Sequence, residues 1–477
     1  MTPNWLSTFA LIFWPVVALY LYETRPVNQA TLWTILGGFL LLPVGAAIKL
    51  EMIPQFDKIS IPNLAALIGC MLVLRGTPRL WYGFGLPEVL LLMWLLGPFI
   101  TSEFNTDSLT YGSIFLPATT LYDALSAVVA QFIFMIPFFL GRQLMRNSAD
   151  NEEILRSLVI AGLIYSPLLI LEMRMSPQLH TWVYGYFPHS FGQQMRAGGF
   201  RPVVFLGHGL VVAFFVMTTA VAAAAFWRTQ TKTLHLPAAG ITTYLGAILI
   251  LCKSLGSLLY GVVLVPMVRF VKPRGQVGLA IICATIAFSY PLLRAADLVP
   301  TEVMISAAKM VEEERGDSLK TRFDQEQQLL EHASHRLLFG WGRFGRSRVY
   351  DAESSKDVSI TDGHWIITMG EYGVFGFVAE FGLLALTVFR AASALRFIQP
   401  ERDRIYLTTL ALIVAINMVE LLPNATLSPW TCLLAGALLG RAEALRGASR
   451  VPSSANSNVL SNRYRERMRP IKASNGR

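Results

Sequence analysis

The residues SLKTRFDQEQQLLEHASHRLLFGWG (318–342) and DGHWIITMGEYGVFG (362–376) decide how this chain is organised. The first segment is polar, has apolar residues near helical spacing, and ends in Gly340-Trp341-Gly342. Because glycine commonly ends a helix, this segment predicts an amphipathic helix at about 318–338 that lies against a membrane face. The second segment passes from Asp362-Gly363-His364 into a long apolar run. Nearly all the rest is apolar, so we expect the soluble chemistry here.

The composition is that of a polytopic membrane protein. Of the 477 residues, 53% are hydrophobic and only 15% are charged. About 20 apolar residues are needed per crossing, which predicts an all-α protein with about 12–13 transmembrane helices. The four cysteines lie in apolar runs without metal-ligand spacing, so neither a disulfide framework nor a zinc site is predicted. The predicted spans are 5–22, 30–49, 62–76, 84–101, 115–141, 154–173, 202–227, 238–252, 254–270, 276–293, 365–389, 405–422 and 427–440.

The distribution of Lys and Arg predicts the orientation of the chain. The basic tail and the basic loops that precede it on the same side should be cytoplasmic. The segments 174–201, 295–364 and 423–426 then lie outside, whereas the side of the N-terminus stays open. The predicted parts are an N-terminal bundle (1–294), a large extracytoplasmic loop with the amphipathic helix (295–364), C-terminal transmembrane helices (365–440) and a basic, disordered cytoplasmic tail (441–477).

Several polar residues stand at the predicted outer boundary. His364 could accept a proton there, although a lone interfacial histidine is more often a polar anchor. Glu371 lies two turns further along the same helix, where an acid is costly without a partner. Arg201 precedes Pro202 at the start of a span and could either bind an anion or extend to the interface. His208 is interpreted as a packing residue between two glycines.

Together these stretches resemble a known family. The segment Arg201-Pro202-Val203-Val204-Phe205-Leu206-Gly207-His208 is similar to the arginine-led motif of bacterial O-antigen ligases and of O-antigen or exopolysaccharide polymerases. The order Arg322, Phe339-Gly340-Trp341-Gly342, His364, Gly370-Glu371-Tyr372-Gly373 and Gly376 is similar to a second motif of that family. Trp365 stands where the family has Asn, and Lys253-Ser254-Leu255 replaces a Ser-Arg pair.

The resemblance implies a GT-C-like glycosyltransferase of the bacterial inner membrane, with its large loop in the periplasm. It would be inverting and metal-independent, and it would polymerise or transfer glycan repeat units from undecaprenyl pyrophosphate. In that reaction His364 would activate the acceptor, and arginines would stabilise the pyrophosphate that leaves. The expected pyrophosphate-binding residues are Arg201 and Arg322, helped by Arg294, Lys253 and Arg196; Glu371 and Asp362 are expected to support the site.

The expected partners are the lipid-linked glycan, a glycan or lipid acceptor, membrane lipids and other polysaccharide assembly proteins. No nucleic acid, metal or cofactor is expected. Polymerisation is favoured over ligation to lipid A core or another acceptor, since a fold alone does not fix the acceptor. A flippase or exporter of lipid-linked glycans and a non-catalytic assembly partner stay open. A flippase should carry its charges through the bundle, whereas here they gather at the outer rim.

Overall fold

The computed structural model describes residues 2–450 except 52, 78–79, 197, 312 and 352–355. Residues 451–477, which make up most of the predicted basic tail, lie outside the described residues. The described chain is mostly helical, and each predicted span contains a helix. The helices long and apolar enough to cross a membrane are α1 (Trp5–Thr24), α4 (Leu86–Glu103), α5 (Leu121–Leu144), α6 (Ser148–Met175), α8 (Gly209–Thr229), α11 (Pro273–Ala295) and α14 (His364–Ala394).

Shorter or more polar helices complete the bundle. Two of them, α9 (Ala238–Leu251) and α10 (Leu255–Phe270), meet at Lys253, as the sequence predicts for a pair joined by a polar turn. The α8 helix is enclosed by other helices, whereas α1 leaves most of its surface to the surroundings. The remaining helices of this group are α2 (Val27–Leu41), α3 (Ser60–Leu74), α15 (Glu401–Glu420) and α16 (Pro429–Arg450).

Several predicted boundaries were wrong. The span 30–49 ends early, since α2 stops at Leu41 before Pro43 and the chain then forms the hairpin of β1 (Ala47–Ile48) and β2 (Phe56–Asp57). The span 115–141 begins late, because a capping box of Thr120 and Asp123 starts α5 after the hairpin of β3 (Leu109–Tyr111) and β4 (Ile114–Leu116). The α16 helix continues past the predicted tail boundary at 441, where Glu443 pairs with the buried Arg142 of α5.

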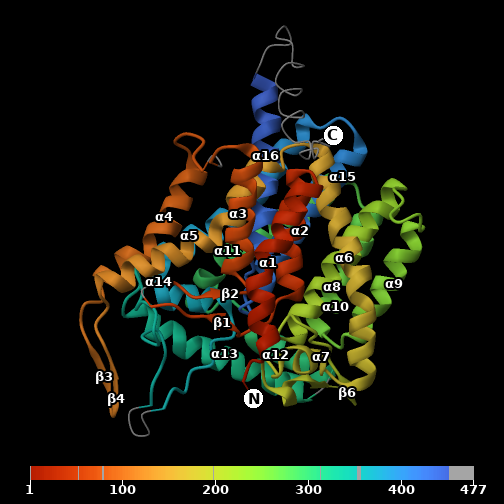
Figure 1. Ribbon diagram of the computed structural model, residues 1–477. Coiled ribbons are helices and arrows are strands. Elements are labelled where there is room, and N and C mark those ends of the chain that lie inside the picture. Colours follow the sequence, from red (N-terminus) through yellow and green to blue (C-terminus); the bar gives the residue numbers. More distant parts are fainter. Residues whose placement is uncertain are drawn as a thin grey trace.

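The basic loops that the sequence assigns to the cytoplasmic side gather at one end of the bundle. There Arg228 pairs with Glu401 at 3.1 Å, and Arg402 pairs with Glu152 at 2.5 Å. The opposite end carries α7 (Leu179–Tyr184), η1 (Phe191–Gln194), β5 (Met195–Arg196), β6 (Gly199–Phe200), α12 (Thr301–Val311) and α13 (Glu313–Ser334) (Figure 1). The start of the chain lies at this same end, because Asn4 Nδ2 donates a hydrogen bond to the Val183 carbonyl at 2.9 Å.

The amphipathic helix predicted at 318–338 is α13. It begins five residues earlier and ends at Ser334, and the sequence did not predict the α12 helix before it. The segment 335–339 forms turns rather than helix. These turns lead into Gly340-Trp341-Gly342, which lies against α14.

The α14 helix is broken at Gly373, where φ is +64° and ψ is −163°. At the break, backbone hydrogen bonds to the 337–342 segment replace helical ones. The amides of Val374 and Phe375 donate to the carbonyls of residues 337 and 338, at 2.8 and 3.1 Å. The amides of Trp341 and Gly342 donate to the carbonyls of residues 370 and 371, at 2.8 and 2.9 Å. The two glycine motifs therefore form one structural unit, in which each satisfies the backbone groups of the other.

Candidate functional site: two adjoining cavities

A cavity of about 660 Å³ opens at the end of the bundle that carries α13. We call it the arginine cavity, because Arg196, Arg201 and Arg322 line it. Arg322 pairs with Asp362 across 3.1 Å at its rim, so Asp362 acts as a counter-ion here. Three of the predicted pyrophosphate-binding residues, which come from segments far apart in the sequence, therefore face one space.

Arg201 is held by its surroundings at the wall of this cavity. Its side chain is buried, and its Nε donates to the Lys253 carbonyl at 3.2 Å. Burial and the neighbouring arginines, Arg196 first among them, lower the pKa of Arg201 from 12.5 to about 10. The arginines around Arg201 therefore repel one another, and an anionic ligand in the cavity would reduce this repulsion.

The loop 201–208 positions this arginine. The sequence predicts that helix starts at 202, but α8 begins at Gly209 and the preceding residues form an irregular loop. The buried carboxylate of Glu172 holds this loop, because it accepts hydrogen bonds from the amides of Val203 and Val204, both at 2.7 Å. The two backbone donors stabilise the buried carboxylate of Glu172 and keep this segment out of the helix. The apolar composition of the segment did not predict this loop.

His208 has a different place from the one predicted. It caps α8, since its Nδ1 accepts a hydrogen bond from the Leu210 amide at 3.1 Å, and it also lines the arginine cavity. Burial, with His189 and Arg201 nearby, lowers the pKa of His208 from 6.5 to about 4. His208 is therefore neutral at physiological pH, and its Nε2 lies 3.4 Å from Oε1 of Gln193, which also lines the cavity.

Two predicted helpers do not contact this space directly. Arg294 is buried beneath α13, where its Nε lies 3.7 Å from Glu326 and its guanidinium donates to the Phe323 carbonyl at 3.2 Å. Lys253 donates from Nζ to the Arg196 carbonyl at 3.3 Å. Both residues therefore support the walls of the site, and neither is among the residues that line the arginine cavity.

A second cavity, of about 610 Å³, contains the predicted catalytic residue; we call it the histidine cavity. His364 is the first residue of α14, and its Nε2 forms a short hydrogen bond with Oε1 of Glu380. Glu371 and Arg343 line the same cavity. With Nε2–H directed at a carboxylate, Nδ1 is the ring nitrogen that is able to accept a proton.

The break in α14 creates the pairing of His364 with Glu380. In a straight helix these residues, sixteen positions apart, would be separated by roughly 24 Å. Folding at Gly373 brings the second segment of the helix back to the first. The sequence indicated Glu371 as the nearby acid but missed Glu380, since only the backbone angle of one glycine places it there.

The two cavities adjoin at the loop between α15 and α16. Ala425 lines both of them, with Asn424 and Thr426 on the arginine side and Leu427 on the histidine side. The loop is tied to His364, because the amide of His364 donates to the carbonyl of residue 421 at 2.9 Å. A substrate in each cavity would meet the other at this loop.

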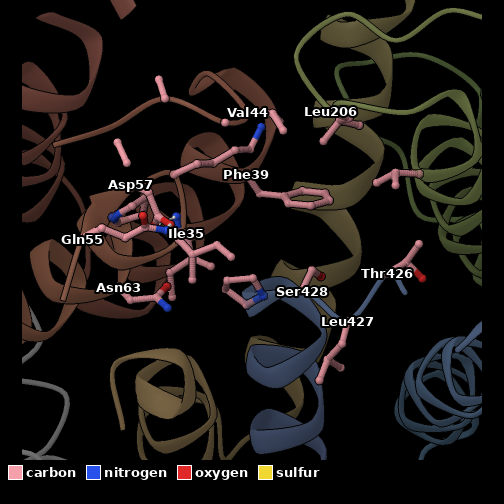
Figure 2. Close-up of a pocket in the computed structure, with 18 of the residues that line it drawn as sticks. Ile35, Phe39, Val44, Gln55, Asp57, Asn63, Leu206, Thr426, Leu427 and Ser428 are labelled. Carbon is pink, nitrogen blue, oxygen red and sulfur yellow. Dashed lines mark hydrogen bonds between the residues drawn. The ribbon is translucent and has the colours of Figure 1, made fainter. Parts of the chain in front are cut away.

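A third cavity, of about 550 Å³, reaches the same loop and is called the hairpin cavity. Figure 2 shows Gln55 and Asp57 of the β1–β2 hairpin on one wall and Phe39 and Leu206 on the other. Lys58 also lines it and donates from Nζ to the Phe205 carbonyl at 2.5 Å. Burial lowers the pKa of Lys58 from 10.5 to about 7.

The other arginines after the FGWG segment have structural roles. Arg346 is fully buried and donates to the carbonyls of Trp341, Asp107 and Pro117 at 3.1, 2.9 and 2.9 Å. Arg348 pairs with Asp357 at 2.5 Å. Only Arg343 of this group faces a cavity described above.

No family model and no curated protein matches this chain.

Proposed function

We propose that this protein is a glycosyltransferase that polymerises lipid-pyrophosphate-linked glycan units at the outer face of the bacterial inner membrane. The observation that carries the proposal is the pair of adjoining cavities, one with three arginines and one with a His–Glu pair. The resemblance of the motifs that build both cavities points to the same chemistry. We also propose that the fold is GT-C-like.

The donor pyrophosphate occupies the arginine cavity in this proposal. A guanidinium matches two phosphate oxygens at once, and buried cations that are already in place stabilise charge as it develops. Arg201 and Arg322 take this role. The lipid chain of the donor remains on the membrane side of the bundle.

The acceptor hydroxyl lies in the histidine cavity, beside Nδ1 of His364. Its oxygen forms the new bond to the anomeric carbon while the bond from that carbon to the pyrophosphate oxygen breaks, and that electron pair leaves with the lipid pyrophosphate. The hydroxyl proton passes to His364, and the carboxylate of Glu380 stabilises the imidazolium formed. A single displacement of this kind inverts the anomeric configuration.

The charges also favour transfer over transport across the membrane. The arginines of the site lie at one end of the bundle, whereas a path for a lipid-linked anion would need cations along its length. Ligation to lipid A core uses the same chemistry with another acceptor. The glycan profile of a deletion strain separates the two: single repeats indicate a polymerase, and long lipid-linked chains indicate a ligase.

Transfer by the purified protein tests the proposal, with donor binding and turnover measured separately. His364→Ala should abolish transfer with donor binding nearly unchanged. Arg201→Ala should lower turnover by about 10²–10³-fold, and Arg201→Lys should recover only part of it. Arg348→Ala, which removes an arginine of the same outer surface, is the matched control and should have no effect. Full transfer by His364→Ala would refute the assignment.

A further inference from the structure

The two adjoining cavities carry opposite charge. Among the residues that the structure describes, three arginines and one carboxylate line the arginine cavity, and three carboxylates and one arginine line the histidine cavity. The histidine cavity's carboxylates come from the β1–β2 hairpin and from both segments of α14. The charged residues are Arg196, Arg201, Arg322 and Asp362 in the first cavity, and Asp57, Glu371, Glu380 and Arg343 in the second.

We infer that the acceptor is a neutral or amino sugar, with no phosphate or carboxylate close to the hydroxyl that attacks. This inference rests on the proposed function and names its acceptor class. An anionic acceptor would enter a cavity in which carboxylates outnumber cations, and the repulsion would oppose its binding. The same carboxylates accept hydrogen bonds from sugar hydroxyls and would pair with an ammonium group.

The local contacts of Asp57 are with neutral groups. Asp57 accepts hydrogen bonds from the amides of Ile59 and Ser60, both at 2.9 Å, and these donors orient the carboxylate. Glu380 contacts His364, and the single Arg343 offsets one carboxylate.

The remaining lining suits a sugar. Gln131 and Ser126 from α5, Thr368 from the first segment of α14 and Gln55 from the hairpin offer neutral hydrogen-bonding groups. Amides and hydroxyls of this kind bind sugar hydroxyls without requiring a charge. The negative potential therefore selects the charge class of the acceptor, and these groups select its hydroxyls.

The cavity charge is measured with cysteine probes that need no knowledge of the substrate. Ser126→Cys places a thiol in the histidine cavity, and Ser318→Cys places one in the arginine cavity. Each is reacted with a cationic trimethylammonium and an anionic sulfonate methanethiosulfonate, and the unsubstituted protein, whose cysteines are mostly buried, sets the background. Relative to a small thiol in solution, we expect the cation-to-anion rate ratio to be at least about 10-fold higher at position 126 and to be lower at position 318.

Asp57→Asn keeps the hydrogen-bonding shape and removes one charge, so it should lower the cation preference at position 126 several-fold and leave position 318 unchanged. A cation-to-anion rate ratio at position 126 that equals or falls below that of the free thiol would overturn the inference.

Transfer distinguishes a failure of this inference from a failure of the proposed function. The donor is the lipid-linked glycan extracted from a deletion strain, and the acceptor is the glycolipid fraction of that strain, with and without phosphatase treatment. Transfer that is unchanged or raised after dephosphorylation supports the inference. A loss of 10-fold or more would mean that acceptor phosphate is required, which overturns the inference and keeps the transferase. Absence of transfer with both fractions overturns the proposed function, and the acceptor assignment with it.

Discussion

Replacing Glu380 by Gln tests whether the proposed catalytic role of His364 depends on its partner across the break in α14. The change keeps the size of the side chain and its ability to accept a hydrogen bond from Nε2 of His364. It removes the negative charge that would stabilise an imidazolium. The expected result is slower transfer with unchanged donor binding, because the donor occupies the neighbouring cavity.

The expected loss in transfer rate follows from how far the His364–Glu380 pair is exposed to solvent. Two unit charges about 4 Å apart interact by about 1 kcal/mol in water and by about 4 kcal/mol at a partly buried site. The side chains of His364 and Glu380 are 21% and 6% exposed, which places the pair between these limits. A loss of about 2 kcal/mol corresponds to about a 30-fold lower rate.

The assay is a double-mutant cycle on the transfer rate of the purified protein. Glu380→Gln is compared in the native background and in the His364→Ala background. Because Glu380 acts through His364, the second comparison should show no further loss above the residual rate. An equal proportional loss in both backgrounds, or a native rate for Glu380→Gln, would refute the reasoning. Glu443→Gln at the opposite end of the bundle is the control for removal of a paired carboxylate.

Gly340→Ala should abolish transfer and lower thermal stability, because a Cβ at φ +71° would lie 2.6 Å from the backbone of Glu371; Gly192→Ala, which meets nothing within 4 Å, should be neutral in the same measurements. Thermal unfolding between pH 7 and pH 10 should show stability rising with pH, since Lys58 with its lowered pKa binds fewer protons folded than unfolded, and Lys58→Met should flatten this slope. An impermeant thiol reagent should label Lys356→Cys in intact cells and Ser393→Cys only after permeabilisation; the reverse order would contradict the orientation. Transfer should persist in EDTA, because the described residues include no group of three metal-ligating side chains, and a loss restored by Mg²⁺ would contradict this.

The sequence predicted the helices because they depend on local composition. Apolar runs of sufficient length must become helices in lipid, whatever their neighbours are. The convergence of Arg196, Arg201 and Arg322 on one cavity could also be anticipated, since the segments that carry them were predicted to lie on the same side. Lengths and charges were enough for these conclusions.

The parts that the sequence did not predict depend on single long-range contacts. The buried acid Glu172 keeps residues 201–208 out of α8, and no periodicity in the sequence distinguishes that acid from others in apolar helices. Arg294 looks like an anion-binding residue at the end of a helix, yet Glu326 of α13 pairs with it. The position of α6 beside the 201–208 loop decides the first outcome, and the position of α13 over the end of α11 decides the second.

The break at Gly373 shows how backbone chemistry and catalysis are linked in this fold. A helix interrupted near a membrane must satisfy the freed amides and carbonyls within the protein, and the segment around Gly340 does so with four backbone hydrogen bonds. Both glycines are needed for the two segments to pack this closely, because a Cβ at Gly373 would lie 2.5 Å from the backbone of Leu338. Without the break Glu380 could not reach His364. The pairing of these two glycine motifs is thus a structural requirement of the His–Glu pair, which explains why motifs more than twenty residues apart in the chain serve one site.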